Sequence, residues 1–246
     1  MPKRRILILE KKASRWPKFL EEFFEDTPSE LKVTEDAALA GEILDRLHPD
    51  LVFFNHALVS PAFLQKVRVH RQTRSELRFT AIGAVKNANP SSLEADMAFE
   101  EPPAFLEFQK RMIRELPMPE KLYLLVVDDD PEIGAMIRDF LEGRTHPAFE
   151  IATAENGKKG LESILRRKPD VLVMDVKMPE MDGRELYRRI RGQQLMLPTI
   201  IFFDPISGAE MAEIRKYGRP AVVDKSSRHA SLPDLTALIL KMAYFG

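Results

Sequence analysis

Two stretches of this chain match closely: Pro169-Asp170-Val171-Leu172-Val173-Met174-Asp175 and, earlier, Pro49-Asp50-Leu51-Val52-Phe53-Phe54-Asn55. Each begins with a Pro-Asp turn and continues as an apolar run that is typical of a buried strand. The later run ends in a carboxylate, and the earlier run ends in the corresponding uncharged amide. The pair therefore predicts a duplicated domain in which one copy keeps a reactive aspartate and the other has lost it.

A second pair of stretches matches at almost the same separation. The first is Arg4-Arg5-Ile6-Leu7-Ile8-Leu9-Glu10, and the second is Lys121-Leu122-Tyr123-Leu124-Leu125-Val126-Val127-Asp128. Continuous apolar runs of this length, each ended by an acid, fit parallel strands that are buried on both faces. Two matched strands at nearly one offset favour an internal duplication.

Strand and helix patterns alternate along both halves. Strands are expected near residues 6–9, 31–34, 51–54, 78–82 and 97–99, and again near 121–127, 171–174, 199–203 and 221–223. Helices are expected near 103–115, 131–142, 157–167, 183–191 and 232–244. The alternation predicts an α/β fold with two doubly wound, five-stranded parallel sheets in tandem. We expect domains at residues 1–117 and 122–246 with a linker at 118–121, because Pro117 and Pro119 break the preceding helix.

Composition excludes several classes of protein. The chain has 246 residues and a formal net charge of −1, so nothing favours nucleic acid or an anionic membrane as an obligate partner. It contains no cysteine, which excludes disulfides and thiolate metal sites. No apolar run approaches the ~18 residues that would span a bilayer, and the run at 6–9 is too short for a signal-peptide core. We therefore expect a cytoplasmic protein.

Charged side chains follow three strands of the second half. Asp128 and Asp129 follow the first strand, Asp175 ends the third, and Lys225 follows the fifth. In an open parallel sheet, reactive groups collect at the carboxyl ends of the strands. Three carboxylates that converge there repel one another unless a cation joins them, and Mg²⁺ prefers such oxygen ligands. Beside a cation and a lysine, one carboxylate is poised to attack phosphorus.

These residues resemble the receiver domain of two-component response regulators, which has a flavodoxin-like (CheY-like) fold. The resemblance covers about residues 121–246 and rests on residues 126–129 (Val-Val-Asp-Asp), 174–183 (Met-Asp-Val-Lys-Met-Pro-Glu-Met-Asp-Gly) and 224–225 (Asp-Lys). It implies that Asp175 accepts a phosphoryl group and that Lys225 contacts that group. It also implies a magnesium site made of Asp128, Asp129, Asp175 and the backbone carbonyl of Lys177, with Asp129 the more direct ligand of the acid pair.

Two positions of the second half depart from the family pattern. The fourth strand of a receiver usually ends in Thr or Ser, but here that position is Phe203, which cannot donate a hydrogen bond. The fifth strand usually carries an aromatic residue that swings inward on activation, and here Val222 takes its place. If the register is shifted, Ser207 supplies the hydroxyl instead. The resemblance then implies retained phosphorylation chemistry with an atypical readout.

The first half carries a degenerate version of the same pocket. Glu10 and Lys11 replace the acid pair, Asn55 replaces the acceptor, Gly83 replaces the hydroxyl residue and Glu101 replaces the lysine. An amide is a poor nucleophile and Lys11 puts positive charge where a metal would lie, so we expect neither phosphorylation nor metal binding in this pseudo-receiver. Lys11 and Glu101 look like a charge swap, and they are expected either to pair or to remain solvated surface charges.

Basic residues crowd the helix after the third strand in each half. They are Lys66, Arg68, Arg71 and Arg74 in the first half and Arg184, Arg188, Arg189 and Arg191 in the second. A solvated helix face is the plainer interpretation, and a docking surface for an acidic partner is the alternative. Base-specific reading of DNA is not supported, because neither half carries a recognition module.

The resemblance implies a tandem response regulator that takes its phosphoryl group from a histidine kinase or a histidine phosphotransfer protein. We expect output by contact with a downstream protein and no enzymatic turnover, since no DNA-binding or catalytic domain follows the last helix. A homodimer is an assembly that the sequence leaves open. One alternative is a scaffold built from two silent receivers. Another is a phosphohydrolase of the haloacid-dehalogenase kind, but that class carries a second Asp where this chain has Lys177.

Overall fold

The computed structural model divides the chain into two compact units. It describes residues 4–27, 29–74, 76–83, 89–115, 120–143, 145, 147–204, 207–225 and 228–245. The first unit holds the described residues up to 115, and the second holds those from 120 onward. Residues 118 and 119 of the predicted linker at 118–121 lie outside the described residues, and its last residue, Lys121, begins a strand.

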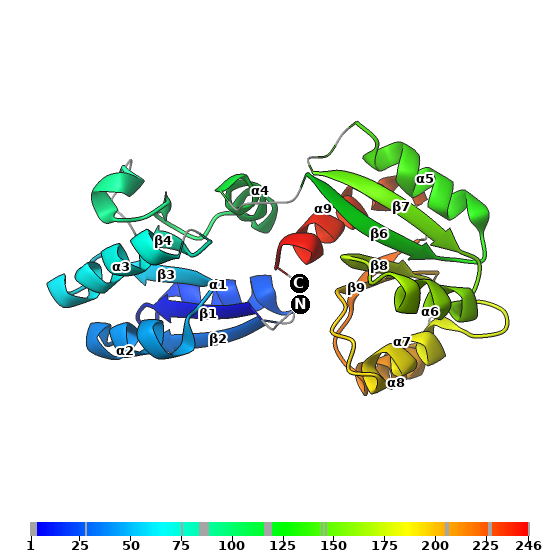
Figure 1. Cartoon of the computed structure of the whole chain (residues 1–246), viewed down its shortest axis with the longest axis horizontal. Helices are drawn as coiled ribbons and strands as arrows, with labels where there is room; N and C mark the ends of the chain where they lie inside the picture. The colour runs from blue at the N-terminus through cyan, green and yellow to red at the C-terminus, as the bar shows by residue number, and fades with distance from the viewer. Residues whose placement is uncertain are drawn as a thin grey trace. The chain divides into compact units, whose positions relative to one another are not determined.

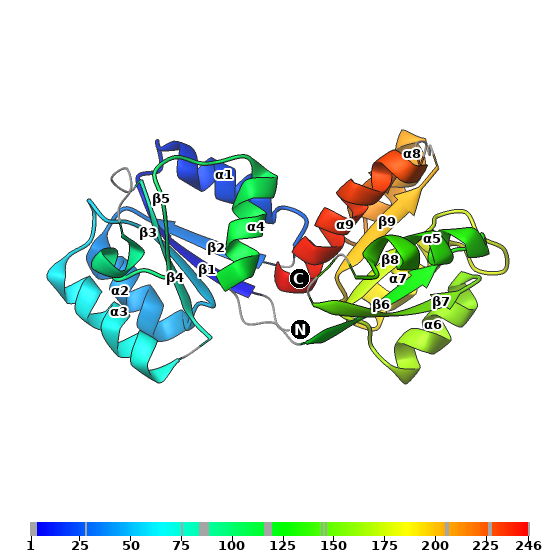
Figure 2. The same cartoon turned by 90° about the horizontal axis from the view of Figure 1, so that it is seen from above.

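The first unit is a five-stranded sheet with helices on both faces (Figure 1). Its elements are β1 (Arg4–Leu9), α1 (Arg15–Phe24), β2 (Ser29–Thr34), α2 (Ala37–Leu47), β3 (Leu51–Asn55), α3 (Pro61–Thr73), β4 (Arg78–Ile82), the 3₁₀ helix η1 (Pro90–Leu93), β5 (Met97–Phe99) and α4 (Phe105–Glu115). The strands are parallel and lie in the order β2-β1-β3-β4-β5. The helices α2 and α3 pack on one face, and α1 and α4 cover the other with a cluster of aromatic rings (Figure 2).

The second unit repeats this arrangement. Its elements are β6 (Lys121–Val127), α5 (Pro131–Leu141), β7 (Ala148–Ala154), α6 (Gly157–Arg166), β8 (Val171–Met174), α7 (Gly183–Gly192), β9 (Thr199–Phe203), α8 (Gly208–Arg215), β10 (Ala221–Asp224) and α9 (Arg228–Phe245). All pairings are parallel, in the order β10-β9-β8-β6-β7. Counted within each unit, both sheets have the flavodoxin-like order 2-1-3-4-5. The predicted fold class is therefore confirmed.

The alternation of side chains along β6 explains how the second core forms. Leu122, Leu124 and Val126 point to the face covered by α5 and α9, whereas Leu125 and Val127 point to the face covered by α6, α7 and α8. Successive side chains of a strand alternate between faces, so a continuous apolar run supplies both cores at once.

The elements placed from the sequence differ from the observed ones mainly at their ends, whereas the sequence patterns assign no position to β7 or α8. The last helix begins at Arg228 rather than near 232, because the apolar periodicity that marks it starts only at Leu232. Among the described residues, no helix is long and apolar enough to cross a membrane.

The Pro-Asp turns have the same physical role in both units. In the second unit, the N–H of Tyr123 donates to Oδ2 of Asp170 at 2.7 Å, and the N–H of Asp170 donates to the carbonyl of Tyr123 at 2.8 Å. In the first unit, Arg5 and Asp50 make the same pair of bonds, at 2.7 and 2.8 Å. Each aspartate therefore closes the amino end of a parallel ladder and fixes its register.

Replacing either of these aspartates tests whether its hydrogen bonds stabilise the pairing of the strands. We expect Asp170→Ala to lower the free energy of unfolding of the second unit by about 1–2 kcal/mol, because the N–H of Tyr123 loses a charged acceptor. Asp50→Ala should do the same to the first unit, where the chain's single tryptophan, Trp16, reports unfolding by fluorescence. Urea denaturation measures both losses.

The matched control for this experiment is Asp170→Asn, whose side-chain oxygen still accepts the bond. It should lose less stability than Asp170→Ala. Equal losses in the two variants would show that the hydrogen bond to Tyr123 does not stabilise the strand.

Candidate functional site

Strand ends bring the charged residues of the second unit together. Asp175 follows β8, and its N–H donates to the carbonyl of Val127, the last residue of β6, at 2.9 Å. Lys225 follows β10, and its N–H donates to the carbonyl of Phe203, the last residue of β9, at 2.7 Å. Because these bonds continue the parallel ladders, the side chains emerge at the same edge of the sheet as Asp128, which follows β6.

Lys225 lies between two carboxylates. Its Nζ is 2.7 Å from Oδ2 of Asp128 and 3.3 Å from Oδ1 of Asp175. All three residues are buried, with exposed fractions of 4% for Lys225, 7% for Asp128 and 6% for Asp175. One ammonium group cannot neutralise two carboxylates, so the buried cluster keeps an excess of negative charge when both are ionised.

Burial decides the protonation behaviour of the two aspartates. Loss of hydration raises the pKa of Asp128 and of Asp175 above the usual range of a carboxyl group. The charge of Lys225 opposes the rise at both residues without cancelling it. Each of the two carboxyl groups is therefore harder to ionise than an exposed one, and further positive charge at the site would favour the ionised forms.

Asp129 completes a set of three carboxylates. One oxygen from each of Asp128, Asp129 and Asp175 lies within 4.8 Å of the other two, and Asp129 is exposed. Oxygen ligands of this kind suit Mg²⁺, which also keeps several water molecules and so needs an open side. The residues present therefore fit this ion. Lys177, whose carbonyl is the further predicted ligand, is an exposed residue in the loop after β8.

The path of that loop depends on Gly183. Its N–H donates to the carbonyl of Val176 at 2.9 Å, and a Cβ on Gly183 would lie 2.0 Å from the carbonyl oxygen of Asp175. No side chain fits such an approach. Asp182 then caps α7 by accepting a bond from the N–H of Glu185 at 2.8 Å. The Asp-Gly pair therefore ends the loop at a fixed point beside the acid cluster.

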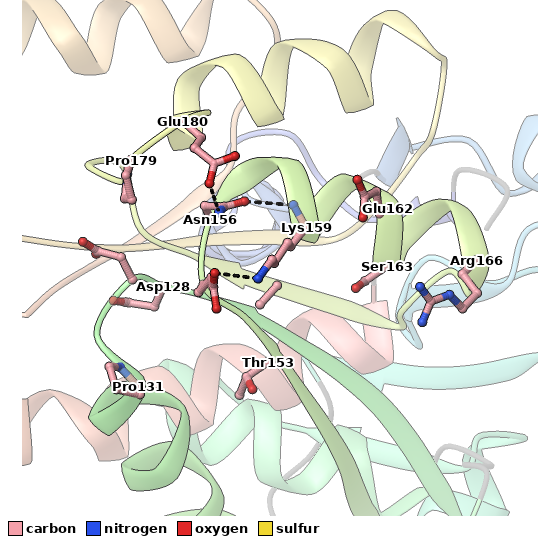
Figure 3. Close-up of a pocket in the computed structure, with 13 residues that line it drawn as sticks. Asp128, Pro131, Thr153, Asn156, Lys159, Glu162, Ser163, Arg166, Pro179 and Glu180 are labelled. Atoms are coloured by element: carbon pink, nitrogen blue, oxygen red, sulfur yellow. Dashed lines mark hydrogen bonds and ion pairs between the residues drawn. The ribbon is translucent and has the colours of Figure 1, made fainter.

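A cavity of about 740 Å³ opens beside Asp128 and Asp129 (Figure 3). The start of α5, the end of β7, helix α6 and the loop after β8 contribute its lining. Lys159 on α6 lines it and pairs with Glu155 at 2.6 Å. A volume of this size lies in the range of ligand sites, roughly 300–1,000 Å³. Two of the three clustered carboxylates, Asp128 and Asp129, therefore line a cavity of the size of a ligand site.

Residues 124–236 match the family model of the response regulator receiver domain. The second unit contains a receiver domain.

Curated relatives share this domain over part of their length. The alkaline phosphatase synthesis transcriptional regulatory protein PhoP of Bacillus subtilis (strain 168) is 33% identical over 94 residues, which are 36% of this chain and 38% of that protein. The protein-glutamate methylesterase/protein-glutamine glutaminase of Geobacillus kaustophilus (strain HTA426) is 38% identical over 111 residues, which are 44% of this chain and 31% of that protein. This chain therefore spans well under half the length of these relatives.

A solved structure is also similar. The response regulator domain of Thermotoga maritima CheB aligns at 22% sequence identity with a TM-score of 0.45, covering 50% of this chain and 96% of that chain.

The two atypical positions of the receiver domain lie on β9 and β10. Phe203 ends β9, is partly buried and packs against the core on the face of α6, α7 and α8. Val222 on β10 is 41% exposed. Ser207 does not replace the missing hydroxyl: it caps α8, accepting from the N–H of Glu210 and donating to the carboxylate of that residue at 2.9 Å. The shifted-register alternative is therefore wrong.

The first unit fills the corresponding pocket with hydrogen bonds. Glu10 follows β1 and is 1% exposed, and the Nδ2 of Asn55 donates to its two carboxylate oxygens at 3.1 and 3.2 Å. The N–H of Lys11 donates to the same carboxylate at 2.7 Å. Gly83 has a φ of +61°, and a Cβ there would lie 2.9 Å from the Nδ2 of Asn55. The carboxylate of Glu10 therefore finds its hydrogen-bond donors within its own unit.

The predicted pair between Lys11 and Glu101 is wrong. Glu101 pairs instead with Arg15 at 3.2 Å, and both side chains of that pair are largely exposed. Lys11 is exposed, and the described residues offer its ammonium group no ion pair. The reason is geometric, because the Lys11 side chain lies outside the pocket while its backbone N–H serves Glu10.

The basic residues of α7 are mostly paired within their own unit. Arg184 binds Asp182 at 2.6 Å, and Arg188 and Arg189 each bind Glu185 at 2.7 Å. These two arginines hold the pKa of Glu185 at about 2. In the first unit, α3 is similar, with pairs Lys66–Asp45, Arg68–Glu94 and Arg71–Asp96. This pairing favours a solvated helix face.

Replacing Asp175 tests whether the buried cluster carries excess negative charge. Asp175→Asn takes away a buried carboxylate with a raised pKa and leaves Lys225 bonded to Asp128. We expect the melting temperature of the metal-free receiver domain to rise by a few degrees. We also expect Mg²⁺ to stabilise the variant less than the wild type. Calorimetry in chelator and then in Mg²⁺ measures both effects.

The pH dependence of the stability difference between Asp175→Asn and the wild type tests whether burial of the carboxyl group causes it. A carboxyl group whose pKa is raised by folding stabilises the fold below its ordinary pKa of about 3.9, and this contribution is lost as pH rises through the raised value. The stability gained by Asp175→Asn should therefore be greatest near neutral pH and vanish in acid. A variant that is less stable than wild type at neutral pH would contradict burial as the cause.

Restoring a carboxylate in the first unit tests its hydrogen-bonded pocket. Asn55→Asp places a second carboxylate beside Glu10, at a position where an amide now donates at 3.1 Å. We expect the first unit to lose about 2 kcal/mol of unfolding free energy at neutral pH. Trp16 fluorescence during urea denaturation measures the loss.

Asn55→Ala is the matched control, since it removes the donor without adding charge. Acid should rescue Asn55→Asp toward the level of Asn55→Ala. Equal stability of wild type and Asn55→Asp at neutral pH would show that the Glu10 pocket tolerates a second charge.

Proposed function

We propose that this protein is a phosphorylated signalling protein of the two-component kind. Its receiver domain accepts a phosphoryl group on Asp175 from a histidine kinase or a histidine phosphotransfer protein, with Mg²⁺ as cofactor. The observation that carries the proposal is the buried contact of Lys225 with Asp128 and Asp175 beside the exposed Asp129. The match of residues 124–236 to the receiver family supports it.

The proposed chemistry is one displacement at phosphorus. An oxygen of Asp175 forms a bond to phosphorus, and the bond from phosphorus to the donor's imidazole nitrogen breaks. The electrons of that bond return to the ring nitrogen, and the imidazole leaves in neutral form because its other ring nitrogen carries a proton. Lys225 is placed to balance the charge of the phosphoryl oxygens, since its Nζ already lies 3.3 Å from Asp175.

Asp128 and Asp129 hold the cation in this proposal. Mg²⁺ bound to them would neutralise oxygens of the transferring phosphoryl group. Asp129 is exposed beside the cavity and can meet a hydrated ion, whereas Asp128 is fixed by its bond to Lys225. Asp175 then differs from Asp128 in having the looser contact with the lysine, which leaves it the better nucleophile.

The first unit takes no phosphoryl group in this proposal and is a pseudo-receiver. Asn55 stands at the acceptor position, and its Nδ2 is held by Glu10. Output is by contact with a downstream protein, and the chain acts as an acceptor rather than as an enzyme with turnover. The relatives named as a transcriptional regulator and a methylesterase match over only part of their lengths, so their activities do not support an activity for this chain.

A silent scaffold is the second candidate. It is favoured by Phe203, which leaves the acceptor pocket without a hydroxyl at the end of β9. A phosphohydrolase with an aspartyl phosphate is less well supported, because Lys177 occupies the place of that class's second aspartate.

Phosphorylation with a small donor separates these candidates. We expect phosphoramidate with Mg²⁺ to add one phosphoryl group to the wild type, detected by intact mass, and none to Asp175→Asn. Asp139→Asn, which changes an exposed carboxylate of α5, is the matched control and should be labelled normally. Chelation of Mg²⁺ should abolish labelling.

Two results would overturn the proposal. Equal labelling of wild type and Asp175→Asn would place the phosphoryl group elsewhere. No labelling of the folded wild type by any histidine-type donor would favour the scaffold.

A further inference from the structure

Glu180 has an unusual backbone conformation. It lies in the loop between β8 and α7 with a φ of 61°, in the left-handed region that side chains other than glycine rarely adopt. Its side chain is exposed, so apolar burial does not hold it there. Some specific contact must stabilise this conformation against the alternatives.

Two contacts do so. The N–H of Met181 donates to the carbonyl of Pro179 at 2.7 Å and closes a tight turn around Glu180, and the side chain of Glu180 is held by Asn156. The Nδ2 of Asn156 donates to Oε1 of Glu180 at 3.2 Å, and its Oδ1 accepts from the N–H of Lys159 at 2.9 Å (Figure 3). Asn156 is only 2% exposed although it is polar. The second bond caps α6, but a cap requires only an oxygen. The amide donor is therefore used to hold Glu180.

A second bond ties the same two segments together. The N–H of Gly157 donates to the carbonyl of Met181 at 2.9 Å, and a Cβ on Gly157 would lie 2.5 Å from that oxygen. The start of α6 is therefore hydrogen-bonded to two consecutive residues of the loop, 180 and 181. The other ends of the loop are fixed by Asp175, bonded to Val127, and by Gly183.

We propose that Asn156 and Glu180 are positioning residues of the magnesium site. Their hydrogen bond, called the latch below, holds the loop that runs from Asp175 through Lys177 at the edge of the acid cluster. Both residues line the same cavity as Asp128 and Asp129. The latch rests on the proposed function, because it acts on the metal ligands and not on the phosphoryl group itself.

The latch should be visible in metal affinity. Groups that orient metal ligands typically change affinity ~10–100-fold when removed. The latch is one bond at 3.2 Å among several that hold the loop, so we expect about a tenfold loss of Mg²⁺ affinity, at the lower end of that range.

Two variants of Glu180 separate the bond from the charge. Glu180→Gly loses the acceptor but suits the left-handed backbone, so the fold should be as stable as wild type without metal. Glu180→Gln loses the charge but keeps a side-chain oxygen that accepts from Asn156. We expect titration calorimetry of the full chain to show weaker Mg²⁺ binding for Glu180→Gly and nearly normal binding for Glu180→Gln.

Asn156→Ser tests the other partner. A serine still caps α6, but it is too short and has no amide to reach Glu180. Its loss of Mg²⁺ affinity should equal that of Glu180→Gly, and the double variant should lose no more than either alone. Melting temperatures in chelator check that each variant is folded.

The outcomes distinguish the latch from the proposed function. Normal Mg²⁺ affinity of Glu180→Gly, in a chain whose wild type binds Mg²⁺ and is phosphorylated, would overturn the latch alone. Equal weakening by Glu180→Gln and Glu180→Gly would also overturn it, because charge rather than the bond would be responsible. A wild type that neither binds Mg²⁺ nor accepts phosphate would overturn the proposed function itself.

Discussion

Lys225 Nζ bridges Asp128 and Asp175 at 2.7 and 3.3 Å in a buried setting, and this contact depends on the order of the strands. β8 pairs directly with β6, but β9 separates both of them from β10. The lysine must therefore reach past the end of β9, and its Nζ lies 5.6 Å from the centre of the Phe202 ring on that strand. A long side chain with an apolar stem suits this crossing. Because the cluster is buried, water does not screen the charge of the carboxylate that Lys225 leaves unbalanced, and that charge is costly.

The first unit has the same strand order and the same aspartate-capped ladder, but its buried carboxylate is paired with an amide. Asn55 donates to both oxygens of Glu10, so a neutral amide and a single carboxylate satisfy each other. Nothing then requires a lysine after the fifth strand, and Glu101 is instead exposed and bound to Arg15. With an amide in place of the second carboxylate, the pocket has less negative charge to balance. Positive charge is then not required at the lysine position or at the position of a bound cation.

The sequence predicted what depends on backbone periodicity and missed what depends on side-chain direction. Apolar runs ended by Asp128, Asp175 and Lys225 determine which residues share a sheet edge, because parallel strands leave no other place for them. The direction of the Lys11 side chain is not encoded in that periodicity, and its predicted partner was wrong. The Asn156–Glu180 bond was also missed, since it requires a left-handed residue, although Asn-Gly at 156–157 is a local signal of a helix start.

In the proposed function, the first effect of phosphorylation that the protein can sense is the added negative charge. The end of β9 offers a phenyl ring rather than a hydroxyl, and Val222 already faces outward, so neither can follow a phosphoryl group by hydrogen bonding. An aspartyl phosphate adds negative charge to a pocket in which one ammonium group already faces two carboxylates. Phosphorylation and Mg²⁺ binding must then strengthen each other by linkage. The elements that can transmit this coupling are those that touch the ligands: Lys225, which Asp128 and the phosphoryl group share, and the loop held by the latch.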